Sequence, residues 1–360
     1  LGVIDKILPP KSFFVIKSRL ENLKEIYLTK EVIKYIFQNI FRNSIKINYI
    51  MCLIKLIKPK KIITLVDNSV DFHNIYKLLH NSDISFYAIQ NAFRNDIYLK
   101  NIFSLSNYSG NYFCFGDYEI NSIKNSTPYK SNLRLKAIGS IRIELAKEHI
   151  LKNNKKIDEI YDICLISEAV SEIGTSGGIN YSQYEDWQKI QARLLRYTLM
   201  FCEKYNKKLL FLGRNNLKSK NSELNIKEEY LFYKFNNQVK DFNLQFFDKS
   251  NYENIKHLLQ SKVIVGHVST LLQESFGLKK KILVCDWANK NLRKDFNSGD
   301  FPGDGILKLK SDSFTDFEKR LLEILNLDFN QYLSKTINQK LIYNLNFKTL
   351  DFLRNEMKGS

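Results

Sequence analysis

The chain has 360 residues, of which 44% are hydrophobic and 13% aromatic, and its net charge is +17. A chain of this size and composition buries a large core, which excludes a disordered or fibrous protein, and its length indicates two domains. The charge predicts anionic partners such as nucleotides, acidic glycans or acidic lipid headgroups. Nucleic acid is not expected as a partner, because the sequence has no helix-turn-helix, zinc-finger or RNA-recognition signature.

Short apolar runs alternate with longer amphipathic stretches, as in strand–helix–strand units of a parallel sheet. Strands are expected at 12–16, 61–66, 84–89, 112–115 and 133–138, and then at 161–166, 208–212, 244–247, 262–265, 281–285 and 306–309. The pattern predicts an α/β fold of two Rossmann-like domains, whose mostly parallel sheets face each other across a cleft. We place the domains at 1–150 and 151–330, joined by the polar run 152–156, and expect a helical segment at 331–360 that packs back on the first domain.

Residues 31–58 are apolar on one side and carry Lys and Arg between the apolar positions. The charges interrupt this stretch too often for it to span a bilayer, so two amphipathic helices packed on the sheet are expected. A basic face that rests on a membrane is the alternative. The five cysteines are scattered without a CxxC pair, which indicates buried thiols in a reducing compartment rather than disulfides or zinc.

The stretch 263–284 predicts a strand, a tight turn and a short helix that opens at Ser269 or Thr270. The N-terminus of such a helix is a phosphate site, because its backbone N–H groups are unpaired and its dipole is positive there. His267 lies at this turn and is a candidate donor to a phosphate or leaving group, and Glu274 a candidate acceptor for ribose hydroxyls. The alternative is a plain N-cap, a loop histidine and a solvated glutamate.

Polar residues also follow two neighbouring strands of the first half. Asp67 and Asn68 end one strand, and Gln90, Asn91 and Arg94 follow the next. Adjacent parallel strands place these side chains on one rim that faces the cleft, as expected for ligand-binding residues. Helix capping is the alternative explanation for the aspartate or the second asparagine.

Two strand ends of the second half complete the expected site. Glu168 ends a strand and precedes a glycine-containing loop at 169–181, which is expected to close over a ligand. Gly213 and Arg214 end the next strand, where the guanidinium suits a phosphate or sugar carboxylate, with surface ion pairing as the alternative. The sequence lacks an Asp-x-Asp pair, a Walker loop and a GxGxxG helix start, so we expect no metal and no cofactor beyond the donor.

Five short motifs resemble a group of bacterial surface-carbohydrate biosynthesis proteins, which looks related to retaining transferases that use CMP-activated ulosonic acids such as Kdo or the nonulosonic acids. They are DNS at 67–69, AIQN at 88–91 with Arg94, FCFGDYE at 113–119, GSIR at 139–142 and STLLQESFGL at 269–278. The resemblance implies a GT-B fold, with the acceptor on the first domain and CMP on the second. The matching nucleotide positions are His267, Ser269, Thr270 and Glu274, with Arg214 nearby.

A retaining reaction with two displacements needs a nucleophile and an acid/base group, and Asp67 and Glu168 are the candidates under this resemblance. The chain departs from several CMP-sugar enzymes because His267 is followed by Val268 and not by proline, which leaves the donor open.

The expected function is transfer of an ulosonic acid to a glycan or glycolipid acceptor of capsule or lipopolysaccharide, by a cytoplasmic enzyme peripheral to the inner membrane. The alternatives are a transferase for UDP- or GDP-hexose or for a CDP-polyol phosphate, and a non-catalytic module that binds membrane or glycan.

Overall fold

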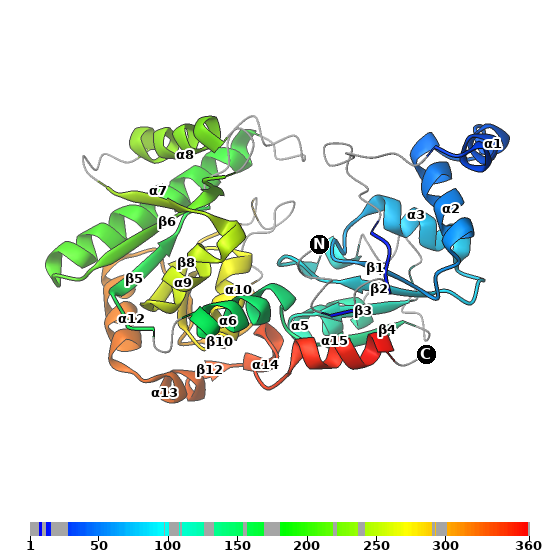
Figure 1. The fold of residues 1–360 in the computed structure, drawn as a ribbon. Coiled ribbons are helices and arrows are strands. Elements are labelled where there is room, and N and C mark those ends of the chain that lie inside the picture. Colours follow the sequence, from blue (N-terminus) through cyan, green and yellow to red (C-terminus); the bar gives the residue numbers. More distant parts are fainter. Residues whose placement is uncertain are drawn as a thin grey trace.

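The computed structural model describes residues 7–8, 12–15, 28–96, 98–100, 108, 110–125, 133–153, 157–168, 181–218, 222–236, 242–289, 292 and 301–358. Within them the chain forms two lobes, each built around a parallel sheet (Figure 1). A 4-stranded sheet lies in the N-terminal half and a 6-stranded sheet in the C-terminal half.

The first sheet has the strand order β1-β2-β3-β4, and its pairings are all parallel. Its strands and intervening helices are β1 (Lys61–Thr64), α3 (Val70–Leu79), β2 (Ser85–Ile89), β3 (Asn111–Cys114), α5 (Asp117–Asn125) and β4 (Arg134–Ala137). Side chains alternate between the two faces of a strand. Phe86 and Ala88 therefore pack with Phe72 of α3, whereas Tyr87 and Ile89 belong to a separate cluster on the other face.

That other face is covered by the C-terminal helix α15 (Thr349–Lys358) and by α6 (Ile141–Asn153). Leu350 and Leu353 of α15 pack with Phe113 and with Leu145 of α6. Lys61 Nζ donates to the carbonyl of Glu356 at 2.8 Å. The end of the chain therefore returns to the first domain, as Figure 1 shows for the red helix beneath the sheet.

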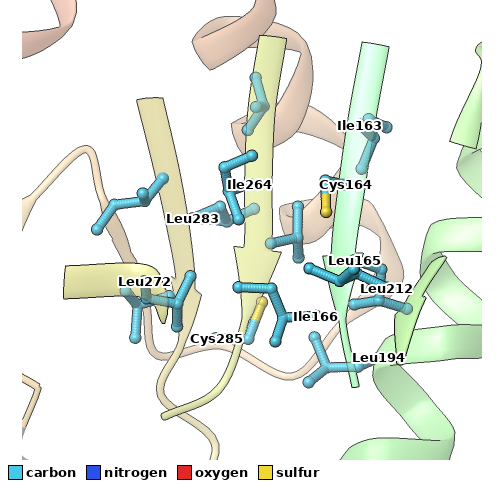
Figure 2. Packing of buried hydrophobic residues seen from close by; sticks show 14 of the residues in the cluster. Ile163, Cys164, Leu165, Ile166, Leu194, Leu212, Ile264, Leu272, Leu283 and Cys285 are labelled. Atoms are coloured by element: carbon cyan, nitrogen blue, oxygen red, sulfur yellow. The ribbon is translucent and has the colours of Figure 1, made fainter. Parts of the chain in front are cut away.

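The second sheet has the order β11-β9-β8-β5-β6-β7, again with parallel pairings. Its elements are β5 (Tyr161–Ile166), α7 (Tyr181–Lys204), β6 (Leu209–Asn216), α8 (Ser222–Asn236), β7 (Leu244–Phe247), α9 (Glu253–Leu259), β8 (Ser261–Gly266), α10 (Thr270–Gly277), β9 (Lys281–Cys285), β11 (Lys308–Leu309) and α12 (Phe314–Asn326). The central strands read as apolar runs because both of their faces are buried. Figure 2 shows their packing, in which Ile163 and Ile264 are 0% exposed.

A group of short elements from the C-terminal part of the chain connects the second sheet to α15. They are α13 (Phe329–Ser334), α14 (Gln339–Ile342) and the antiparallel pair of β10 (Asp304–Gly305) and β12 (Thr336–Ile337). Contacts of α14 with α5 bring this segment onto the first domain before α15 begins.

Most predicted strands are confirmed to within a few residues, but two are not. The prediction at 12–16 is wrong for 12–15, which form no strand and leave Phe14 47% exposed; Ile16 lies outside the described residues. A strand needs backbone hydrogen bonds to a neighbouring strand. Residues 12–15 do not supply them, because within the described residues β1 is the edge of its sheet and pairs with β2 alone. The strand predicted at 306–309 forms only over 308–309.

The two amphipathic helices predicted at 31–58 are confirmed as α1 (Lys30–Asn39) and α2 (Ile45–Ile57). Thr29 and Ser44 cap their N-termini through side-chain oxygens. Over the described residues, no helix combines the length and the apolar character needed to cross a bilayer. The five cysteines are free thiols, and their predicted burial is confirmed.

Candidate functional site

The carboxyl ends of the two sheets meet where the loop after β2 touches the start of α10. The backbone N–H of Phe93 donates to Thr270 Oγ1 at 2.9 Å. The Phe93 ring stacks on Tyr118 of the first domain and on Phe301 beside the second, with centroids 6.3 and 5.8 Å apart. The loop after β2, which carries Gln90, Asn91 and Arg94, therefore lies beside the start of α10.

The first-domain rim is organised by a buried ion pair. Asp67 is 0% exposed and accepts from Arg94 twice, Nε to Oδ2 at 2.9 Å and Nη2 to Oδ1 at 2.8 Å. Tyr112 Oη donates to the same carboxylate at 3.1 Å, and so does the N–H of Asn91 at 3.3 Å. Asn68 follows, half-buried. Asp67 therefore holds the loop that reaches α10, and both of its oxygens are occupied in this conformation.

A second carboxylate, which sequence reasoning did not single out, joins the two domains. Glu119 Oε1 accepts from Gln90 at 2.8 Å and from Gln273 of α10 at 3.1 Å, and Oε2 accepts from the N–H of Gly116 at 3.2 Å. Burial raises the pKa of Glu119 to about 7, against the lowering effect of its amide donors. The sequence signal that could have identified Glu119 is its position at the end of the FCFGDYE motif.

Glu168 lies at the carboxyl end of β5 and is 6% exposed. Its Oε2 accepts from the N–H of Val268 at 3.0 Å and from Gln191 at 3.2 Å, and its carbonyl accepts from Trp187 at 3.1 Å. Oε1 has no hydrogen-bond partner among the described residues. Burial raises the pKa of Glu168 to about 8, with the hydrogen bond from Val268 acting in the opposite direction. Burial therefore favours the protonated form of this carboxyl.

His267 follows β8 directly and lies in the core, with 0% of its surface exposed. Its Nδ1 is 2.5 Å from the carbonyl oxygen of Cys285. A carbonyl only accepts, so Nδ1 carries a proton and donates it to this oxygen. The ring also packs edge-on against Trp187 at 5.4 Å. The structure places His267 beneath the turn, one residue before the amide that contacts Glu168.

The helix α10 begins as the sequence predicts. Ser269 is its N-cap and accepts from the N–H of Leu271 at 3.3 Å. Glu274, one turn in, is 0% exposed and faces the first domain, where it accepts from Ser140 Oγ at 2.8 Å and from Arg142 Nε at 3.0 Å. A second guanidinium nitrogen of Arg142 contacts the other carboxylate oxygen. In this conformation the Glu274 carboxylate joins the domains.

Two glycines of the quoted motifs have a packing role at the same junction. A Cβ at Gly277 would lie 2.5 Å from the ring of Tyr343, and one at Gly139 would lie 2.7 Å from its hydroxyl. Gly139 also has a φ of 83°, which other residues rarely adopt. Tyr343 Oη accepts from the N–H of Ser140 at 2.6 Å. The tyrosine thus fills the space between α10 and the loop after β4.

The carboxyl end of β6 carries the remaining predicted residues. Gly213 lies against the ring of Phe246, where a Cβ would approach to 2.3 Å, and Arg214 is exposed. This end of β6 is held by Glu229 of α8, which was not predicted as a site residue. Its carboxylate accepts from the N–H groups of Arg214 at 2.7 Å and of Asn215 at 3.1 Å.

Three cations lie near this end of β6, namely Lys249, Arg214 and Arg142. Lys249 Nζ contacts the carbonyl of Arg214. Burial lowers the pKa of the Lys249 ammonium, and the positive charges of Arg142 and Arg214 lower it further. The structure therefore brings a first-domain arginine near two second-domain cations.

Other features of the described residues lie elsewhere. No group of three or more His, Cys, Asp or Glu side chains suited to a metal ion occurs among them. A charged cavity of about 520 Å³ opens at the β11 edge of the second sheet, and no predicted site residue lines it. The predicted closing loop at 169–181 lies outside the described residues except for its last residue, Tyr181, which begins α7.

No protein-family model and no curated protein sequence matches the chain. Among solved structures, the UDP-GlcNAc 2-epimerase from Methanocaldococcus jannaschii matches with a TM-score of 0.54 and 11% identity, over 88% of this chain and 83% of that one. The UDP-GlcNAc 2-epimerase from Neisseria meningitidis bound to UDP-GlcNAc matches with a TM-score of 0.51 and 12% identity, over 93% and 84%. The S. aureus MnaA–UDP co-structure matches with a TM-score of 0.50 and 11% identity, over 96% and 85%.

At these identities the similarity shows the fold alone. It confirms the expected α/β fold of GT-B type with two Rossmann-like domains.

Proposed function

We propose that the chain is a glycosyltransferase that takes a sugar from a nucleotide donor held mainly by the second domain. The support is the GT-B fold together with α10, whose N-terminus follows the central strand β8 at the place where such sheets bind ligands. Ser269 and Thr270 offer backbone N–H groups there for phosphate. The first domain holds the acceptor at the rim of Asn68 and Asn91, while the buried Gln90 and Arg94 position this rim through Glu119 and Asp67.

The observation that carries the proposal is the buried carboxyl of Glu168, which contacts the turn before α10 through the N–H of Val268. Its pKa of about 8 suits a general acid that gives its proton to a departing oxygen near neutral pH. The hydrogen bond from Val268 links this carboxyl to the turn that leads into α10. Charge on the leaving phosphate is stabilised by the helix N-terminus and by Arg214, without a metal ion.

Retention of the anomeric configuration through two displacements also requires a nucleophile, and Asp67 is the proposed group on the first domain. Its ion pair with Arg94 must open for the carboxylate to reach a sugar, since both oxygens are occupied here. His267 acts through position: its ring supports the turn that presents Val268 to Glu168. Glu274 reaches a ribose only after Arg142 releases it.

The donor class proposed first is a CMP-activated ulosonic acid, for a capsule or lipopolysaccharide acceptor. An ulosonic acid carries a carboxylate, and the cations Arg142, Arg214 and Lys249 beside the β6 turn suit an anionic sugar. UDP- or GDP-hexose and CDP-polyol phosphate donors fit the same helix N-terminus and are the alternatives. The third possibility is a basic, non-catalytic module that binds membrane or glycan.

The same fold also occurs in a second enzyme class. Two of those reported above are UDP-GlcNAc 2-epimerases, and one of these was bound to UDP-GlcNAc. An epimerase alters the donor sugar without an acceptor. The two classes are therefore distinguished by whether the product is an altered nucleotide sugar or a glycosylated acceptor.

The deciding experiment titrates the protein with CMP, CDP, UDP and GDP in a calorimeter and then incubates it with the sugar conjugate of whichever nucleotide binds. Binding of CMP above the others supports the ulosonic donor, and a product that forms only when an acceptor glycan is present supports transfer. Binding of UDP alone would remove the ulosonic proposal. An altered sugar formed without acceptor would replace the transferase by an epimerase.

A further inference from the structure

The helix α1 has apolar side chains on two sides, and only one of them is covered within the described structure. Val32 is 0% exposed and packs with Cys52 and Leu53 of α2. Tyr35 packs against the same cluster. This contact attaches α1 to the rest of the first domain.

The uncovered side forms a continuous apolar surface. Ile33, Phe37 and Ile40 lie three and four residues apart, so they share one side of the helix, and they are 43%, 69% and 38% exposed. Phe41, which is 101% exposed, follows in the connection to α2, and Ile45, which is 60% exposed, is the first residue of α2. We call these five residues the α1 stripe. Single exposed apolar residues are ordinary, whereas a contiguous group of this kind marks a binding surface.

Positive charge borders the α1 stripe. At 100° per residue, Lys30 and Lys34 lie along one edge of it, and both are exposed, as is Arg42 next to Phe41. Between residues 28 and 46 the sequence has Glu31 as its acidic residue against four basic ones. An apolar side flanked by lysine and arginine is the pattern of a helix that lies in the interface of an anionic bilayer.

We propose that the α1 stripe docks the first domain on an anionic lipid bilayer. Phe37 and Phe41 enter the headgroup region, while Lys30, Lys34 and Arg42 contact lipid phosphates. Figure 1 shows α1 beyond α2 at the outer margin of the first lobe, on the side away from the second sheet, where a flat surface can reach it. The inference concerns this surface alone and does not depend on the donor or on the reaction proposed above.

The experiment measures flotation of the full chain with vesicles of phosphatidylcholine alone and of phosphatidylcholine mixed equally with phosphatidylglycerol. We expect binding to the mixed vesicles that weakens with added salt, and at least about a ten-fold loss of partitioning for the double variant Phe37→Ser/Phe41→Ser. The variant Lys30→Gln/Lys34→Gln is expected to lose the preference for anionic vesicles. The control is Phe235→Ser on α8, which replaces a phenylalanine that is 78% exposed and is expected to bind as the original chain does.

Three outcomes would overturn the proposal. The first is absence of binding to either vesicle, and the second is an equal loss of binding for the control variant. The third is a change of assembly or folding: if Phe37→Ser/Phe41→Ser converts a dimer to a monomer in sedimentation, or lowers the Tm, the α1 stripe covers another protein surface. An unchanged Tm with lost flotation supports lipid as the occupant.

Discussion

The side chain of Arg142, at the start of α6, donates through Nε to Glu274 of α10 at 3.0 Å and so ties the first domain to the proposed nucleotide helix. Glu274 is fully buried, and Ser140 from the same loop donates to it as well. A ligand that uses Glu274 must therefore replace contacts that hold the domains together. If the nucleotide binds through Glu274, we expect binding and domain position to be coupled through this carboxylate.

The first prediction concerns the stability of this pair. Replacement of Arg142 by alanine leaves a buried carboxylate without its cation, so we expect the free energy of unfolding in urea to fall by about 3 kcal/mol. The control is Arg134→Ala, which breaks a more exposed pair with Glu356 and is expected to cost less than about 1 kcal/mol. Equal losses in the two variants would show that Glu274 does not need Arg142.

A second prediction follows from the two buried carboxyls. Folding raises the pKa of Glu119 to about 7 and that of Glu168 to about 8, above the value of 4.5 for a free glutamate. The folded state therefore binds more protons than the unfolded state between these values, and stability falls as the pH rises from about 5 to about 8. The expected loss is on the order of 2 kcal/mol for each residue at pH 8.

This pH dependence is measured by urea unfolding at a series of pH values. Glu119→Gln and Glu168→Gln, whose side chains do not ionise, are each expected to flatten the slope. Glu318→Gln on α12 is a control, because its carboxylate pairs with the exposed Lys204. A stability that rises from pH 5 to pH 8 in the original chain would contradict the assignment of protonated carboxyls.

The third prediction is kinetic. If Glu168 is the general acid, kcat/KM falls above about pH 8 as the carboxyl loses its proton. Glu168→Gln is expected to lower kcat/KM by about 10²–10⁴-fold and to remove this alkaline limb. A variant that keeps the limb at pH 8 would assign the titration to another group.

The fourth prediction separates two roles of Asp67. Its bidentate contact with buried Arg94 predicts that Asp67→Asn lowers the free energy of unfolding by about 3 kcal/mol, because the guanidinium loses its counter-charge. Urea unfolding and turnover are measured together, and the double variant Asp67→Asn/Arg94→Leu is expected to regain part of the stability. Full stability combined with lost turnover would instead mark Asp67 as a nucleophile whose ion pair is dispensable.

Local patterns in the sequence predicted the elements well. Apolar runs at 161–166 and 281–285 are strands with the predicted bounds, and the polar residues after β8 predicted that a helix opens at Ser269. Strand-end rules also predicted that Asp67, Asn91 and Arg94 lie together. These are properties of neighbouring residues and of parallel sheets in general.

Long-range packing was beyond such patterns. Glu119 and Glu229 lie in helices whose sequences resemble solvated helices, and only the tertiary fold buries them. The pairing of Arg142 with Glu274 depends on how the two domains meet, and the spacing of apolar residues within one helix or strand does not predict this. For His267, sequence reasoning placed the ring at the mouth of the site, whereas the turn directs it to Cys285 in the core.

Hydrogen–deuterium exchange with and without the cognate nucleotide tests the central claim most directly. If nucleotide binds at α10, protection appears in the residues from Gly266 to Glu274 and at the strand ends that carry Glu168 and Arg214. Protection confined to the charged cavity that Arg320 lines, or no protection in any part of the second domain, would contradict the account.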